Sequence, residues 1–154
     1  MKTAICYYSR HHGNTLKVLQ AMADVGDIDL IDVTKQKAAL ADYDCVGFAS
    51  GIYGFEFQKA VVEFAHQQLP QSKPVFFVYT YGGAKGNGAK TMAEIAAEKN
   101  CPVLGEFSCK GFDTFGPFKL VGGIAKGHPN EKDMENARRF YQEIQAACEG
   151  GMKR

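Results

Sequence analysis

A short polar stretch near the start of the sequence has the composition of a site for a phosphate group. It follows the apolar run at residues 4–8, contains one glycine and leads directly into a helix-like pattern. A strand, a tight loop and a helix start bring backbone N–H groups and the positive end of the helix dipole to one point, which favours a bound phosphate. The residues of this loop are Ser9, Arg10, His11, His12, Gly13, Asn14 and Thr15.

The spacing within this loop excludes the two common nucleotide motifs. It contains neither G-x-G-x-x-G nor G-x-x-x-x-G-K-[ST], so the loop indicates a phosphate but not ATP, GTP or a nicotinamide dinucleotide. Taken alone, it fits an ordinary strand–helix turn with solvated side chains equally well. The other loops of the chain are needed to distinguish a phosphate site from an ordinary turn.

Two further glycine-containing loops follow predicted buried strands. Residues 45–49 and 74–79 are almost entirely apolar, which is typical of strands covered on both faces of a parallel sheet. The aromatic side chains that follow suit stacking on a planar ring, and glycine turns let backbone N–H groups approach its heteroatoms. The candidate binding residues in these loops are Ser50, Gly51, Ile52, Tyr53, Gly54, Thr80, Tyr81, Gly82, Gly83 and Gly86. Phe57, farther along, is expected in the core instead.

The order of the elements predicts an α/β fold. Strand and helix patterns alternate five times, which favours a parallel five-stranded sheet with helices on both faces, within one domain over residues 1–154. Ligands bind such sheets at the carboxyl edge. The three loops follow the first, third and fourth strands, so we expect them on that edge, joined there by the long segment 111–129. Asn130, with Asp133 three residues later, is a suitable N-cap for the last helix.

The cysteines and histidines show no metal-binding pattern. The five cysteines include no C-x-x-C pair, and Cys6, Cys45 and Cys109 lie within predicted strands. We therefore expect small buried apolar side chains in a reducing cytoplasm, not disulfides or zinc ligands. His11 and His12 are adjacent, so a regular helix or strand would not direct both at one ion. We expect no metal site.

Composition excludes several other classes of function. The net charge is +1 and no basic cluster is dense enough to indicate nucleic acid. No stretch approaches the roughly 20 apolar residues of a membrane span, and the N-terminus lacks the apolar core of a signal peptide. We expect a cytoplasmic protein that needs no membrane, and a monomer, since no segment suggests a dimerisation arm.

The sequence of these loops resembles that of the flavodoxin family. The loop that ends in Gly13-Asn14-Thr15 is similar to the family's FMN phosphate loop, commonly T/S-x-T-G-x-T. The resemblance is closest to short flavodoxin-like proteins with S-x-H-H-x-N-T loops and a G-F-D-T-x-G-P segment, here residues 111–117. It covers the length, the five strand–helix units and all three cofactor loops. It implies a doubly wound sheet of order 2-1-3-4-5.

The resemblance also implies a cofactor and a role. FMN would bind non-covalently, with its phosphate on residues 9–15 and its ring between residues 50–57 and 80–86. The protein would then transfer electrons between redox partner proteins, with a reductase or ferredoxin-type donor and an acceptor that the sequence leaves open. The flavin does the chemistry in such proteins, so we predict no catalytic side chain.

This sequence departs from the family pattern in three respects. Arg10 and His12 stand where the family usually has hydroxyl residues, so charge is expected to contribute more to holding the phosphate. The chain has no tryptophan, and tyrosine must take the place of that common stacking residue. Many flavodoxins are strongly acidic, whereas this chain is nearly neutral.

Two other functions remain open from sequence. One is a small FMN-dependent NAD(P)H:quinone-type reductase, in which residues 111–129 would form a substrate lid. The other is a binding module that has lost its flavin. A phospho-receiver is disfavoured, because Tyr8-Ser9 and Ser50-Gly51 occupy the strand ends where that class needs acidic residues.

Overall fold

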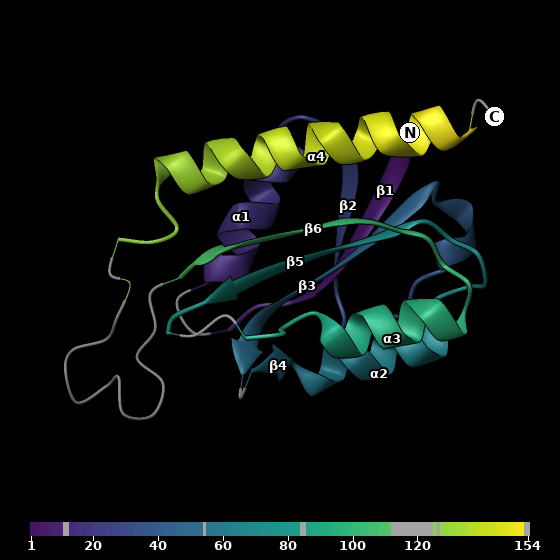
Figure 1. The fold of residues 1–154 in the computed structure, drawn as a ribbon, viewed down its shortest axis with the longest axis horizontal. Coiled ribbons are helices and arrows are strands. Elements are labelled where there is room, and N and C mark those ends of the chain that lie inside the picture. The colour runs from purple at the N-terminus through teal and green to yellow at the C-terminus, as the bar shows by residue number, and fades with distance from the viewer. Residues whose placement is uncertain (11–12, 54, 84–85, 112–124, 126, 153–154) are drawn as a thin grey trace.

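The computed structural model describes residues 1–10, 13–53, 55–83, 86–111, 125 and 127–152, and shows a parallel sheet between two pairs of helices (Figure 1). The strands of the sheet lie in the order β2-β1-β3-β5-β6. Strand β4 lies off this path, so β5 and β6 are the fourth and fifth of its strands, and the order is the predicted 2-1-3-4-5. The prediction of a flavodoxin-like fold is confirmed. The strands are β1 (Lys2–Tyr8), β2 (Asp27–Asp32), β3 (Cys45–Tyr53), β5 (Val75–Tyr81) and β6 (Val103–Lys110).

One short strand was not predicted. Strand β4 (Glu56–Phe57) pairs antiparallel with the end of β3. It turns the chain back before the next helix begins, and it places Phe57, 4% exposed, in the core as expected. The pairing involves two residues on each side, which is too short to leave a periodic pattern in the sequence.

Helices cover both faces of the sheet (Figure 1). Helix α1 (Asn14–Ala23) packs beside α4 (Glu131–Met152) on one face, and α2 (Lys59–Gln68) beside α3 (Lys90–Glu98) on the other. A 3₁₀ turn, η1 (Leu40–Asp42), lies between β2 and β3. Within the described part of the chain, no helix is long and apolar enough to cross a membrane.

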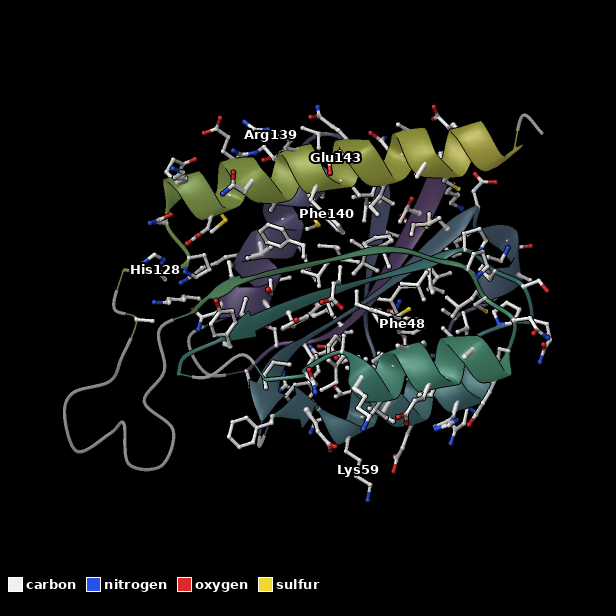
Figure 2. The ribbon with its side chains drawn as sticks, in the orientation of Figure 1. Phe48, Lys59, His128, Arg139, Phe140 and Glu143 are labelled. Carbon is white, nitrogen blue, oxygen red and sulfur yellow. The ribbon has the colours of Figure 1, made fainter. Side chains whose placement is uncertain are left out.

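Each face of the sheet has its own apolar core. Phe48 and Phe77 belong to the cluster under α2 and α3, whereas Phe76 belongs to the cluster under α1 and α4. On that second face Phe140 extends from α4 toward the sheet (Figure 2), and its ring centroid lies 6.1 Å from that of Phe76. Gly47 makes room for this packing, because a Cβ there would lie 2.5 Å from Phe76 Cζ. The central strands are therefore fixed by burial on both sides.

The N-terminus of α4 is closed by a reciprocal pair of hydrogen bonds. Asn130 Oδ1 accepts from the Asp133 backbone N–H at 2.9 Å, and Asp133 Oδ2 accepts from the Asn130 N–H at 2.8 Å. The same carboxylate lies 2.8 Å from His128 Nδ1. The predicted N-cap is therefore confirmed. It starts α4 close to the carboxyl edge of the sheet, the edge that carries the candidate site.

All five cysteines are free and buried. Cys6, Cys45 and Cys109 lie in β1, β3 and β6, as predicted. Burial raises the pKa of the Cys6 thiol to about 12, and burial together with the negative charge of Asp133 raises the pKa of the Cys109 thiol to about 12. Cys45 and Cys148 also have raised pKa values, chiefly because of burial.

The folded protein is therefore expected to resist thiol reagents. Only the thiolate reacts; the pKa is raised at Cys6, Cys45, Cys109 and Cys148, and all five thiols are buried. Ellman's reagent near pH 8 should therefore modify the native thiols about 100-fold more slowly than those of the chain in guanidinium chloride. The measurement is the rise in absorbance on release of the reagent anion. A native protein with even one thiol that reacts at the unfolded rate would contradict this expectation.

Candidate functional site

The ends of three adjacent strands bring the predicted loops together. Tyr8, the last residue of β1, is paired in register with Ser50 of β3. Gly51 of β3 is paired with Thr80 of β5. The loops that follow these strands therefore start side by side at the carboxyl edge of the sheet (Figure 1). This is the edge where parallel α/β sheets bind their ligands.

The loop after β1 wraps around the N-terminus of α1. Gly13 is the N-cap residue, with φ +65°, a left-handed conformation that favours glycine. Its carbonyl accepts the first helical hydrogen bond from the Lys17 N–H at 3.1 Å. Ser9 Oγ reaches back to accept from the Leu16 N–H at 3.2 Å. The first turn contains no acidic residue, so no carboxylate there opposes an anion at this helix end.

A buried hydrogen bond joins the first loop to the end of β5. The hydroxyls of Thr15 and Thr80 lie 3.0 Å apart, and either oxygen can be the donor. Thr15 is 2% exposed and Thr80 is 4% exposed. These two predicted site residues therefore fix the start of α1 against the neighbouring strand end.

The segment after β6 begins between the same loops. Gly111 donates its N–H to the carbonyl of Tyr81 at 2.9 Å. On its other side, a Cβ on Gly111 would lie 2.6 Å from Asn14 Nδ2. Gly111 was not among the predicted site residues. The sequence signal that points to it is its position as the first glycine of the G-F-D-T-x-G-P segment, the remainder of which lies outside the described residues.

Ser50 holds the second loop in place. Its side chain is fully buried. The hydroxyl donates to the Gly51 carbonyl and accepts from the Gln58 N–H at 3.0 Å. Together with the pairing of Ile52 and Phe57 across β3 and β4, these bonds close a hairpin at the carboxyl edge. Ser50 therefore contributes to the site by shaping this loop.

Phe55 is one of the aromatic residues that the sequence places in the second loop, although it was not among the predicted binding residues. It is 62% exposed and has φ +70°, which is rare for a bulky side chain. Its ring lies against the third loop, since a Cβ on Gly86 would be 3.3 Å from Phe55 Cδ1. An exposed aromatic ring therefore lies where the second and third loops meet. No periodic pattern distinguishes it from its aromatic neighbours in the sequence.

Arg10 is directed toward β2 in this structure. Its guanidinium carbon lies 5.1 Å from the centroid of the Tyr8 ring, and Nη2 donates to Thr34 Oγ1 at 3.4 Å. Burial raises the pKa of the nearby Asp32 carboxyl, but hydrogen bonds from Thr34 and the charges of Lys35 and Arg10 outweigh burial and hold that pKa below its usual value. The guanidinium thus lies on the side of the loop away from β3 and β5.

Some predicted residues lie outside the described part of the chain. His11, His12 and Gly54 are among them, and the side chain of Tyr53 is not described. Tyr81 and Gly82 are half-buried at the end of β5, whereas Gly83 and Gly86 are exposed. Among the described residues, no group of three or more histidine, cysteine or acidic side chains is arranged to hold a metal ion.

Comparison with known proteins identifies the family. The family profile described as a flavodoxin domain matches residues 4–111. The chain belongs to the flavodoxin family. An uncharacterized protein of Methanocaldococcus jannaschii is 37% identical to this flavodoxin-family chain over 147 residues, which span 94% of this chain and 98% of that protein.

Solved structures share the flavodoxin fold over nearly the whole chain. A flavodoxin from the domain Archaea has a TM-score of 0.67 at 17% identity, covering 97% of this chain and 99% of that one. The Fusobacterium nucleatum flavodoxin bound to flavin mononucleotide has a TM-score of 0.68 at 12% identity, covering 96% and 99%. Rubredoxin:oxygen oxidoreductase from Desulfovibrio gigas has a TM-score of 0.75 at 17% identity, covering 98% of this chain but 37% of that one.

Proposed function

We propose that this flavodoxin-family protein binds FMN non-covalently and transfers electrons between redox partner proteins. The observation that supports this most directly is the meeting of three loops and Gly111 at one edge of the sheet, joined by the Thr15–Thr80 hydrogen bond and the close contact of Gly111 with Asn14. The structurally similar Fusobacterium flavodoxin is bound to FMN. Family membership and site geometry therefore point to the same cofactor.

The first loop fits the phosphate end of FMN. The N-terminus of α1 has no acidic residue in its first turn, and its dipole favours a dianion. A Cβ placed on Gly13 would meet none of the described residues within 4 Å, so the described part of the chain leaves open space directly beside the helix start. Residues 9–15 would hold the phosphate through backbone N–H groups and the hydroxyls of Ser9 and Thr15.

The second and third loops fit the ring of FMN. Residues 50–57 and 80–86 would lie on either side of it, with Tyr81 among the described aromatic side chains available for stacking. When bound, the flavin would accept and release electrons at this edge of the sheet. The protein's part is to bind the ring, orient it and exclude water from one side of it.

Visible absorption tests whether FMN binds. After incubation with FMN and desalting, the protein should retain flavin bands with a shifted, structured shape. Riboflavin, which lacks the phosphate, is the matched control and should bind at least about 100-fold more weakly, because it cannot use the helix N-terminus. A colourless protein after desalting would refute the proposal, and equal affinity for the two flavins would refute the phosphate assignment.

Steady-state oxidation of NAD(P)H distinguishes a carrier from a reductase. The FMN-loaded protein is expected to oxidise NAD(P)H only slowly when a quinone is the sole acceptor. Rapid turnover without a partner reductase would favour the alternative, a small NAD(P)H:quinone-type reductase. That result would leave the assignment of FMN intact.

A further inference from the structure

Charged side chains are distributed unevenly between the two edges of the sheet. The carboxyl edge comprises the loops that follow the strands, each with the first helical turn after it. The opposite edge comprises the segments that lead into the strands. At the carboxyl edge, the described cations are Arg10, Lys17, Lys35, Lys37, Lys59, Lys90, Lys110 and Lys132, and the described anions are Asp32, Glu56, Glu131 and Asp133. This edge is clearly positive.

The opposite edge has the reverse balance. Its described anions are Asp24, Asp27, Asp42, Asp44 and Glu98, and its described cations are Lys2, Lys73 and Lys99. The net charge of +1 for the whole chain therefore conceals two edges of opposite sign. A near-neutral total says little about the field that an approaching molecule meets at the candidate site.

The positive charge nearest the site is available to a partner. Lys17 and Lys110 are both exposed, and neither forms an ion pair within the described part of the chain. Lys110 is paired in register with Tyr81, so it lies beside the aromatic residue expected to flank the ring. Other cations at this edge are partly compensated: Lys35 lies 3.9 Å from Asp32, and Lys59 lies 3.8 Å from Glu63.

An exposed apolar side chain lies at the same edge. Phe55 is 62% exposed and contacts the third loop at Gly86. Protein interfaces are enriched in aromatic residues at their centre, surrounded by a polar rim. Phe55 together with Lys17 and Lys110 therefore supplies both features at this edge, and we call these three residues the docking edge.

We propose that the docking edge binds an acidic electron-transfer protein. This inference depends on the proposed function, because it brings the partner's redox centre to the edge where the flavin would lie. A positive surface accelerates encounter with an acidic protein and repels a basic one. The charge complementarity is thus the reverse of that used by a strongly acidic flavodoxin with basic partners.

The test uses an acidic plant-type [2Fe–2S] ferredoxin as the probe. ¹⁵N-labelled, FMN-loaded protein is titrated with the ferredoxin at an ionic strength of about 20 mM, and the dissociation constant and perturbed amides are obtained by NMR. The perturbed amides should cluster around Phe55, Lys17 and Gly111. The double variant Lys17→Glu/Lys110→Glu should bind about tenfold more weakly, and the difference should largely vanish at about 500 mM ionic strength.

Arg139→Glu is the matched control variant. It changes the net charge by −2, the same change as each single replacement, Lys17→Glu or Lys110→Glu, and Arg139 is exposed on the outer face of α4, pointing away from the sheet (Figure 2). Its partner Glu135 lies 3.5 Å away in a surface pair that contributes little to stability. This variant should bind the ferredoxin within about twofold of wild type, since its charge is remote from the docking edge.

Several results would overturn the proposal. They are absence of ferredoxin binding by the wild type at low ionic strength, a loss in Arg139→Glu as large as that in either single lysine variant, and tighter binding of basic cytochrome c than of ferredoxin. Equal binding of a DNA duplex would assign the edge to nucleic acid instead. Weaker FMN binding by the double variant, in parallel with its weaker ferredoxin binding, would assign the lysines to the cofactor phosphate. Repeating the titration without FMN shows whether the docking edge persists even if the FMN proposal fails.

Discussion

Replacing Gly111 by alanine is expected to weaken FMN binding about 10- to 100-fold, a loss of about 1.4–2.7 kcal/mol in binding free energy. The new Cβ would lie 2.6 Å from Asn14 Nδ2 and 2.9 Å from Asn14 Cγ. Asn14 is 9% exposed and is the first residue of α1, so its side chain has little room to move. Either α1 or the start of the segment after β6 must shift.

The opposite side of Gly111 is also constrained. Its N–H donates to the Tyr81 carbonyl at 2.9 Å, so moving Gly111 away from Asn14 strains the third loop. Both ways of relieving the contact therefore displace a loop that is proposed to hold FMN. Overpacking of this kind typically costs about 1–3 kcal/mol in stability as well. FMN affinity from fluorescence quenching and the free energy of unfolding from urea titration measure the two effects.

Gly150→Ala provides the control for introducing a methyl group. Gly150 lies in α4, and a Cβ there would meet none of the described residues within 4 Å. Alanine is favoured over glycine in a helix by up to about 1 kcal/mol, so this variant should be slightly more stable, with unchanged FMN affinity. If Gly111→Ala retained wild-type affinity for FMN, the segment after β6 would have no part in positioning the cofactor loops.

The fold was predictable because its determinants are local. Apolar runs such as residues 45–49 identify buried strands, alternation of strands with helices gives a parallel sheet, and Asn130 with Asp133 marks the start of α4. Each of these signals lies within a few residues of the element that it specifies. The strand order then followed from the resemblance to a family whose members share it.

The site was predictable only to the level of its loops. Which side chains meet across the loops depends on contacts far apart in the sequence, such as Gly111 with Asn14 and Arg10 with Thr34. The unusual backbone conformation of Phe55 likewise depends on the short pairing of β3 with β4. No pattern within a single element encodes these contacts, so sequence analysis placed the loops at one edge but did not assign their partners.

Substituting valine for Thr15 is expected to weaken FMN binding about 10- to 100-fold and to destabilise the protein by about 1–3 kcal/mol. Valine has the shape of threonine but lacks the hydroxyl, so it leaves the Thr80 oxygen, 4% exposed, without its hydrogen-bond partner. It also removes a proposed donor to the phosphate, and hydrogen bonds to charged groups are the stronger class.

The two effects separate in the double variant Thr15→Val/Thr80→Val. When both hydroxyls are replaced, no buried oxygen is left unsatisfied, so the stability should recover to within about 1 kcal/mol of wild type. FMN affinity should not recover, because the phosphate still lacks the Thr15 donor. Thr3→Val is the control, because Thr3 lies at the start of β1 at the opposite edge of the sheet and its buried hydroxyl accepts a hydrogen bond from Tyr141 Oη at 2.7 Å. This variant also loses a buried hydroxyl but should leave FMN affinity unchanged.

The pairing of these hydroxyls also predicts the behaviour of Thr80→Val alone. Because either oxygen can be the donor, Thr80 can donate to Thr15 and leave the Thr15 proton directed at the phosphate. Thr80→Val removes the hydrogen bond that orients the Thr15 hydroxyl but keeps that hydroxyl as a donor to the phosphate. Its loss of FMN affinity should therefore be smaller than that of Thr15→Val, about threefold to tenfold. Equal losses in the two single variants, with full recovery of affinity in the double variant, would show that the pair acts only by fixing α1 to β5.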